Sequence, residues 1–170
     1  MAEEVKWQPP PPNSVKINWD AAMNHTNKVI GLRIIARDER GKFMAAFSKQ
    51  QDIDTELVVA EAMAALHAII LSQEMNFQNV VFEGDSLQVV QAVNSVSQCN
   101  SIYGHLIEDI KVGLNKMATS SFTHVTRDAN GAAHALAVMA RNHVTGIVKW
   151  DSIPHSICGI VSREELSSTY

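Results

Sequence analysis

The feature that most constrains the fold is a succession of three strand-like segments before the first helical one. In "VKINWD", the apolar Val15, Ile17 and Trp19 alternate with polar residues, which is the period of a β-strand. Residues 28–37 and 42–48 are two further apolar runs, and the turn-forming "DERG" joins them as in a β-hairpin. The pattern predicts three consecutive strands at the start of a sheet.

Helices and strands alternate along the rest of the chain. The spacing of apolar residues predicts helices over residues 56–75, 86–93, 101–117 and 130–144, and strands over 79–84 and 121–126. Asp54 or Thr55 is expected to cap the first of these helices. Three strands followed by alternating elements favour an α/β fold with a mixed sheet covered by helices.

The length of 170 residues suits one domain. We expect a proline-rich lead over residues 1–14, a folded domain over 15–145 and a C-terminal tail over 146–170. The net charge of −4 argues against a strongly basic nucleic-acid binder, although it leaves room for a local basic patch or a metal-mediated contact.

Cysteine usage and hydropathy indicate the compartment. Cys99 and Cys158 are isolated and have no metal-ligand spacing, which is typical of free thiols in a reducing compartment. No secretory signal pattern is present at the N-terminus. The longest apolar run, "LVVAEAMAALHAIIL", contains Glu61 and is too short to span a bilayer. We therefore expect a cytoplasmic or nuclear protein that does not contact membranes.

Glu61 is the most informative residue, because it is the only formally charged side chain between Leu57 and Gln73. A buried carboxylate is costly unless it is paired or bound to a cation, and this helix offers no Lys or Arg. The alternative is that Glu61 lies on the solvent edge of the helix.

Two other acidic residues have plain structural alternatives. Asp20 is expected to end the first strand, where an Asp is often a turn residue. Asp85, with Ser86, stands where a helix cap belongs. Glu83 has the character of a strand residue, and nothing in the sequence assigns it to a site.

The combination of Asp20, Glu61 and Asp85 favours chemistry. Carboxylates at a strand end, inside the first long helix and after the fourth strand can converge at one end of a sheet. Such sites hold Mg²⁺, which prefers oxygen ligands. Two ions about 3.5–4 Å apart can activate a water molecule and stabilise the leaving oxygen of a phosphodiester.

Five motifs occur in a characteristic order: "INWD", "ARDERG", "AEAMAAL", "FEGDS" and "HVTRDANGAAHALA". Over residues 7–162 the chain thereby resembles the ribonuclease H-like family, specifically its plant retroelement-type domains. The resemblance implies a five-stranded mixed sheet, with three antiparallel strands and then two parallel strands, and cleavage of the RNA strand of RNA–DNA hybrids. It also implies a two-metal site for Mg²⁺ or Mn²⁺, in which Asp20 bridges both ions while Glu61 and Asp85 hold the ion on the leaving-group side.

The chain departs from the family in the last motif. The family reads Asn-x-x-Ala-Asp-x-Leu-Ala, whereas residues 130–137 place His134 at the acidic position. Imidazole suits Mn²⁺ or Zn²⁺ better than Mg²⁺. Three interpretations stay open: a helix histidine with no metal role, a surviving ligand, or a relic of lost activity.

Nucleic-acid contacts are expected near the same motif. His124 is a candidate for proton transfer or an ordinary strand-end residue. Arg127 can meet a phosphate or pair with Asp128 or another acid, and Asn130 matches the family motif.

Binding to a hybrid is expected to be weak. The resemblance implies a comparison with cellular ribonucleases H, which often carry a basic helical protrusion after the second helix. Here that connection is "NSVSQCNS", which has no Lys or Arg. The apolar Leu57 and Val58 also stand where the resemblance leads us to expect polar amides before Glu61. The remaining candidate cations are Lys16, Lys28, Arg33 and Arg127.

Two functions follow from the sequence. The first is a metal-dependent endonuclease that cuts the RNA strand of RNA–DNA hybrids and is weakened by His134. The alternative is an inactive ribonuclease H-like module that binds nucleic acid or a protein partner.

Overall fold

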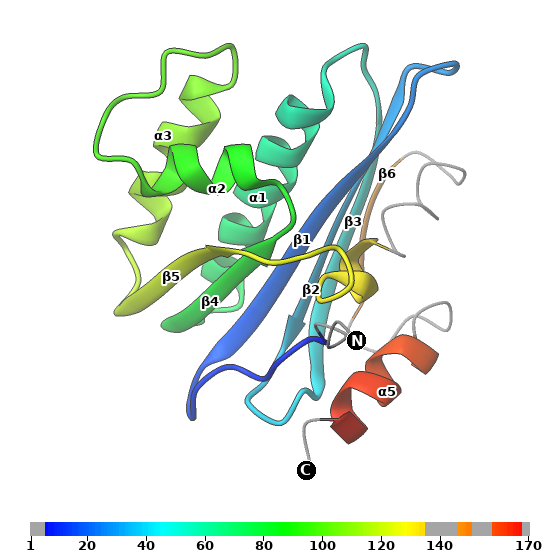
Figure 1. Ribbon diagram of the computed structural model, residues 1–170, viewed down its shortest axis with the longest axis vertical. Helices are drawn as coiled ribbons and strands as arrows, with labels where there is room; N and C mark the ends of the chain where they lie inside the picture. The colour runs from blue at the N-terminus through cyan, green and yellow to red at the C-terminus, as the bar shows by residue number, and fades with distance from the viewer. Residues whose placement is uncertain (1–5, 135–145, 151–157, 168–170) are drawn as a thin grey trace, which may run out of the picture.

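One mixed β-sheet organises the protein, and helices lie on both of its faces (Figure 1). This computed structural model describes residues 6–134, 146–150 and 158–167. The strands are β1 (Val15–Asn24), β2 (Val29–Arg37), β3 (Phe43–Asp52), β4 (Asn79–Gly84), β5 (Thr119–His124) and β6 (Gly146–Trp150). The helices are α1 (Leu57–Glu74), α2 (Leu87–Asn94), α3 (Gly104–Leu114) and α5 (Cys158–Ser167), and residues 131–134 are also helical.

The first three strands form the expected antiparallel meander, with β2 between β1 and β3. The link between β2 and β3 is a tight turn in which the Gly41 amide donates to the Asp38 carbonyl at 2.9 Å. Gly41 has a φ of 79°, a left-handed conformation that glycine adopts without steric cost. The turn chemistry of the "DERG" segment is thus confirmed.

The parallel half of the sheet lies on the other side of β1, where β4 pairs with β1 and β5 pairs with β4. The sheet order is β5-β4-β1-β2-β3-β6. These first five strands confirm the mixed α/β sheet that the sequence pattern indicated.

The expectation that Asp20 ends the first strand is wrong. Strand β1 continues to Asn24 because Ala21, Ala22 and Met23 still pair with β2. The strand that ends at this level is β4, whose last pair with β1 joins Gly84 to Trp19.

A sixth strand comes from the segment expected to be a tail. Strand β6 pairs antiparallel with β3, and Val161 of α5 packs with Ile35, Ala132 and Ala133 on one face of the sheet. The domain boundary at residue 145 stays a prediction, but part of the C-terminal segment belongs to the folded body. Residues 135–144 of the expected helix lie outside the described residues.

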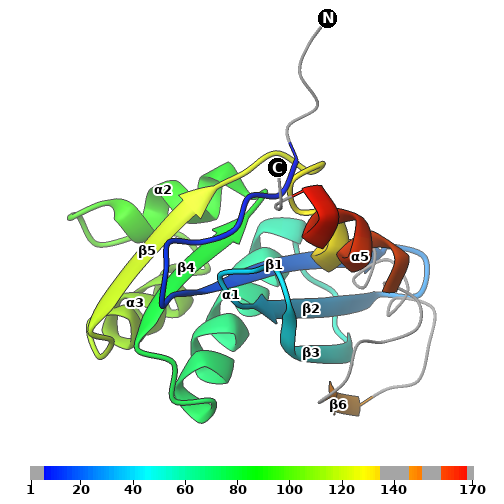
Figure 2. The ribbon, with the colours of Figure 1, turned by 90° about the horizontal axis from the view of Figure 1, so that it is seen from below.

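Helix α1 is the central helix of the opposite face, where it packs with α2 and α3 (Figures 1 and 2). Its alanines allow close approach to the core side chains Ile17 and Trp19 of β1. By length and composition α1 could cross a membrane, contrary to the expectation from the apolar run alone. Half of this stretch is buried inside the fold, as in the core helix of a globular domain.

The expected helix caps are wrong. Helix α1 begins after Glu56, without a side-chain cap, because Asp54 instead pairs with Lys28 at 2.8 Å. The residue at the N-cap of α2 is Ser86, which also makes no capping hydrogen bond, so Asp85 is not a cap.

The α5 face of the sheet carries an ion-pair network formed by Trp7, Lys16, Asn18, Arg37, Glu83 and Glu164. Lys16 Nζ lies 2.7 Å from Glu83 Oε1, and the Asn18 amide joins Glu83 to Arg37. Trp7, from the proline-rich lead, is buried, donates to Asn18 and lies under the Arg37 guanidinium at 3.9 Å. The lead therefore packs on the domain.

Candidate metal centre and nucleic-acid interface

Three carboxylates meet at one end of the β1–β4 pair and form the acidic cluster of Asp20, Glu61 and Asp85. One ligand oxygen from each lies within 4.8 Å of the others. Asp20 is 1% exposed and Glu61 is 6% exposed. The structure therefore brings together the three acids that the sequence singled out, and the alternative of a solvent-facing Glu61 is wrong.

The termination of β4 explains how the cluster forms. Beyond the Trp19–Gly84 pair, β1 has no strand partner on its β4 side among the described residues, so the edge of the strand is open there at Asp20 and Ala21. The Ala21 backbone amide is free there to hydrogen-bond Glu61, which reaches over from α1. Asp85 is the first residue after β4 and completes the cluster.

Burial and like charge make the cluster unfavourable by itself. Burial raises the pKa of Glu61 well above its usual range, and the charges of Asp20 and Asp85 raise it further. Burial also raises the pKa of Asp20, although a hydrogen bond from His134 opposes this. Glu61 Oε2 has no hydrogen-bond partner in the part of the chain that the structure describes. A divalent cation with oxygen ligands fits these residues, since it would neutralise the cluster and take up the orphan oxygen.

His134 contacts the acidic cluster directly. Its Nδ1 lies 2.7 Å from Asp20 Oδ2, and its side chain is 30% exposed. The hydrogen bond to Asp20 is the main cause that raises the pKa of His134, and burial opposes it. His134 thus hydrogen-bonds one oxygen of Asp20, and its role toward a metal stays a prediction.

A groove of about 310 Å³ opens onto the acidic cluster between the N-termini of α1 and α2. It is lined by Leu57, Val58, Glu61, Asp85, Ser86, Gln88 and Arg127. Arg127 Nε donates to Asp85 Oδ2 at 3.2 Å, while its side chain stays 68% exposed. The expected pairing of Arg127 with an acid is confirmed, the acid being Asp85, and its guanidinium stands at the rim of the groove.

Asn130 has a different place from the one expected. It is fully buried, and its amide donates to the Trp19 carbonyl at 2.9 Å, so direct contact with nucleic acid is inconsistent with the structure. Its hydrogen bond fixes the start of the His134 helix beside the residue that precedes Asp20. His124 ends β5 opposite Gly84 and is exposed, and its side chain makes no ion pair with the acidic cluster in the described ranges.

Two of the four candidate cations for nucleic acid are buried. Lys16 is committed to Glu83, and Arg33, whose pKa burial lowers to about 10, donates to the carbonyls of Leu32 and Lys49. The expectation that Lys16 and Arg33 contact a phosphate is therefore wrong. Lys28 and Arg127 remain exposed.

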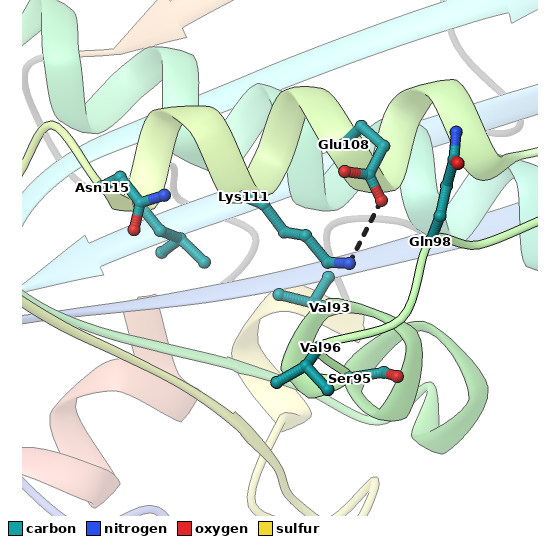
Figure 3. A pocket seen from close by; sticks show the side chains of 8 residues that line it. Val93, Ser95, Val96, Gln98, Glu108, Lys111 and Asn115 are labelled. Atoms are coloured by element: carbon teal, nitrogen blue, oxygen red, sulfur yellow. Dashed lines mark hydrogen bonds and ion pairs between the residues drawn. The ribbon is translucent and has the colours of Figure 1, made fainter.

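A second hollow, of about 610 Å³, lies between α2 and α3 (Figure 3). It borders the loop that replaces the basic protrusion, and its one cation is Lys111. Lys111 Nζ lies 3.1 Å from both Glu108 Oε1 and the Ser97 carbonyl, which ties the loop to α3. The described residues that line this hollow therefore offer no free cation to a phosphate backbone.

The comparisons with known proteins agree with the fold. A family model described as reverse transcriptase-like matches residues 18–140. The chain belongs to the reverse transcriptase-like family. This family assignment and the structural matches to ribonucleases H confirm the ribonuclease H-like resemblance found in the sequence. No curated protein sequence matches the chain significantly.

The reverse transcriptase-like domain is similar to several solved structures. RNase H1 from the archaeon Halobacterium salinarum is 21% identical, with a TM-score of 0.69 over 75% of this chain and 96% of that one. The N-terminal RNase H domain of a Mycobacterium tuberculosis protein is 16% identical, with a TM-score of 0.69 over 76% and 94%. LC11-RNase H1, solved in complex with an RNA/DNA hybrid, is 19% identical, with a TM-score of 0.67 over 75% and 96%.

Sequence reasoning missed two features of the acidic cluster and its surroundings. Nothing in the pattern indicated that Asn130 would be buried against Trp19, because an Asn beside a helix start is equally typical of a surface cap. The pairing of His134 with Asp20 joins residues 114 positions apart, so only the folded chain reveals it.

Proposed function

We propose that this protein is a metal-dependent endonuclease that hydrolyses the RNA strand of RNA–DNA hybrids. The observation that carries the proposal is Glu61, which is buried with an unpartnered oxygen beside Asp20 and Asp85 in the described structure. Crowding three acids does not stabilise the fold, but it provides the ligands that a bound cation needs. The RNA/DNA hybrid in the LC11-RNase H1 structure supports the choice of substrate.

Different residues would bind the metal and the nucleic acid. Asp20, Glu61 and Asp85 would hold Mg²⁺ or Mn²⁺, which supplies Lewis-acid activation of water and stabilisation of the leaving oxygen. Arg127 at the groove rim is placed to contact a phosphate of the strand. Water would attack phosphorus and the bond to the 3′-oxygen would break, leaving a 3′-hydroxyl and a 5′-phosphate.

A second function is a binding module without catalysis. His134 on Asp20 and the burial of Lys16 and Arg33 favour it, since both features weaken the site and its contact with a phosphate backbone. The partner in that case would be nucleic acid or a protein. The reverse transcriptase-like family supports a retroelement-derived origin for either function, and we propose a cytoplasmic or nuclear location.

Cleavage of a labelled RNA–DNA hybrid decides between the two functions. We expect wild-type protein to cut the RNA strand with Mn²⁺ and more slowly with Mg²⁺, and Asp20→Asn to abolish cutting. Asp109→Asn, an exposed acid on α3, is the matched control and should cut like wild type. No cleavage with either ion at high protein concentration would reject catalysis and leave the binding module.

A further inference from the structure

We propose that His134 takes the place of one of two divalent ions, so that this site binds a single ion. The inference rests on the proposed function, because it assigns the number of ions to the same acidic cluster. It concerns a histidine in this chain where the resembling family has an acid.

The first step concerns the two oxygens of Asp20. A carboxylate that bridges two ions gives one oxygen to each. Asp20 Oδ2 already lies 2.7 Å from His134 Nδ1. A Mg²⁺ ion would bind a lone pair of that oxygen about 2.0–2.1 Å away, and the lone pair directed at His134 is already taken by the imidazole. The ring therefore competes with an ion for this oxygen.

The second step is that His134 is held in place. Its backbone amide donates to the Asn130 carbonyl at 3.0 Å. The Asn130 side chain in turn donates to the Trp19 carbonyl at 2.9 Å from a fully buried position. Since Trp19 precedes Asp20 on β1, these two hydrogen bonds hold the His134 backbone beside Asp20, and the 2.7 Å contact of Nδ1 with Oδ2 places the imidazole on the carboxylate. Asn130 acts here as a positioning residue.

The third step is that one ion position remains. Glu61 and Asp85 approach Asp20 with all three ligand oxygens within 4.8 Å. Glu61 Oε2 is buried and has no hydrogen-bond partner among the described residues, so one member of the cluster keeps an acceptor that a cation can satisfy.

Charge balance favours the same number. Three carboxylates offset one divalent ion and leave a net negative charge, which a hydrogen-bond donor on Asp20 stabilises. Two divalent ions would exceed the charge of three carboxylates. A fourth carboxylate at position 134 would match the charge of two divalent ions, whereas an imidazole adds no negative charge.

Isothermal titration calorimetry with MnCl₂ tests the number of ions. Wild type is expected to bind one Mn²⁺ per chain, and His134→Asp to bind two. His105→Asp, an exposed histidine on α3, is the matched control for an added acid and should bind one. Two ions in wild type, or one in a folded His134→Asp variant, would overturn the inference.

NMR of the imidazole protons in the wild-type protein gives a second measurement, which does not depend on whether a variant folds. On addition of Mg²⁺ the Nδ1 proton of His134 should persist, and its loss would overturn the inference. Cleavage distinguishes the two proposals. Two bound ions with cleavage would reject only the single-ion inference, whereas no Mn²⁺ binding in any variant would reject the metal site and the proposed function together.

Discussion

Two buried polar groupings share one sheet but have opposite charge arrangements. The ion-pair network includes Asn18, and the acidic cluster includes Asp20, two residues further along the same face of β1. In the network Lys16 neutralises Glu83, and Arg37 neutralises Glu164. In the acidic cluster three like charges meet, and the basic side chains that pair with them in the described part of the chain are the partly exposed His134 and Arg127.

The difference separates a structural role from a functional one. The desolvation cost of a buried charge is offset when an opposite charge and further hydrogen bonds meet it, so the network can hold the N-terminal lead and α5 on the sheet. Burying like charges costs stability that the apo protein does not recover. We therefore expect substitutions in the network to destabilise the fold and substitutions in the acidic cluster to stabilise it while removing function.

The largest effect should come from breaking the network. Glu83→Leu leaves Lys16 buried without its carboxylate and should lower the free energy of unfolding by about 3–5 kcal/mol. Urea denaturation measures this loss.

The double variant Lys16→Met with Glu83→Leu should recover most of that stability, because no uncompensated charge remains. Lys28→Met breaks an exposed pair and should cost less than about 1 kcal/mol. A Glu83→Leu loss no larger than that of Lys28→Met would contradict the structural role of the network.

The acidic cluster should respond in the opposite direction. Two charges 4.8 Å apart repel by about 3 kcal/mol at an effective dielectric near 20. Glu61→Gln removes this repulsion, but the new amide makes fewer hydrogen bonds than the carboxylate, which offsets part of the gain. The variant should therefore raise the free energy of unfolding in EDTA by about 1 kcal/mol. Added Mn²⁺ should stabilise wild type but not this variant. Destabilisation of apo Glu61→Gln relative to Asp109→Asn would refute the crowding account.

The contribution of the acidic cluster and His134 to the stability of the apo protein should fall as the pH rises. Burial raises the folded-state pKa of Glu61 above its usual value of 4.5, so the folded state binds more protons than the unfolded state above that pH. The raised pKa of His134 acts in the same direction, since its contribution is complete below pH 6.5 and decreases at higher pH. The stability difference between Glu61→Gln and wild type, measured in EDTA from pH 4 to 8, should grow with pH. A constant difference would show that Glu61 does not titrate as described.

The smallest effect on stability should come from the groove rim. Arg127 is 68% exposed, so Arg127→Ala should change the free energy of unfolding by less than about 1 kcal/mol. It should weaken hybrid binding by about threefold to tenfold, because one phosphate contact is lost. Fluorescence anisotropy with a labelled hybrid measures the affinity, with Lys116→Ala as the exposed control. Equal affinities of both variants would remove Arg127 from the interface.

Local sequence features predicted most of the elements. Alternation in "VKINWD" and helical spacing in the segment of α1 reflect which side chains face a core, and this information is local. The isolated Glu61 in an apolar helix predicted a site for the same reason, because the cost of burying one charge is visible in the sequence. The predicted end of β1 at Asp20 was wrong, because the length of the strand is set by its pairing with β2 and not by the residues that follow Asp20.

Long-range contacts decided the rest. No local pattern states that Asn130 is buried under β1, that Trp7 covers Arg37, or that a sixth strand extends the sheet beside β3. The pairing of His134 with Asp20 belongs to the same class. The sequence by itself determined which acids are costly to bury, because that cost belongs to each side chain. Only the tertiary structure decided which charges are compensated, because compensation depends on neighbours that the chain brings together from distant positions.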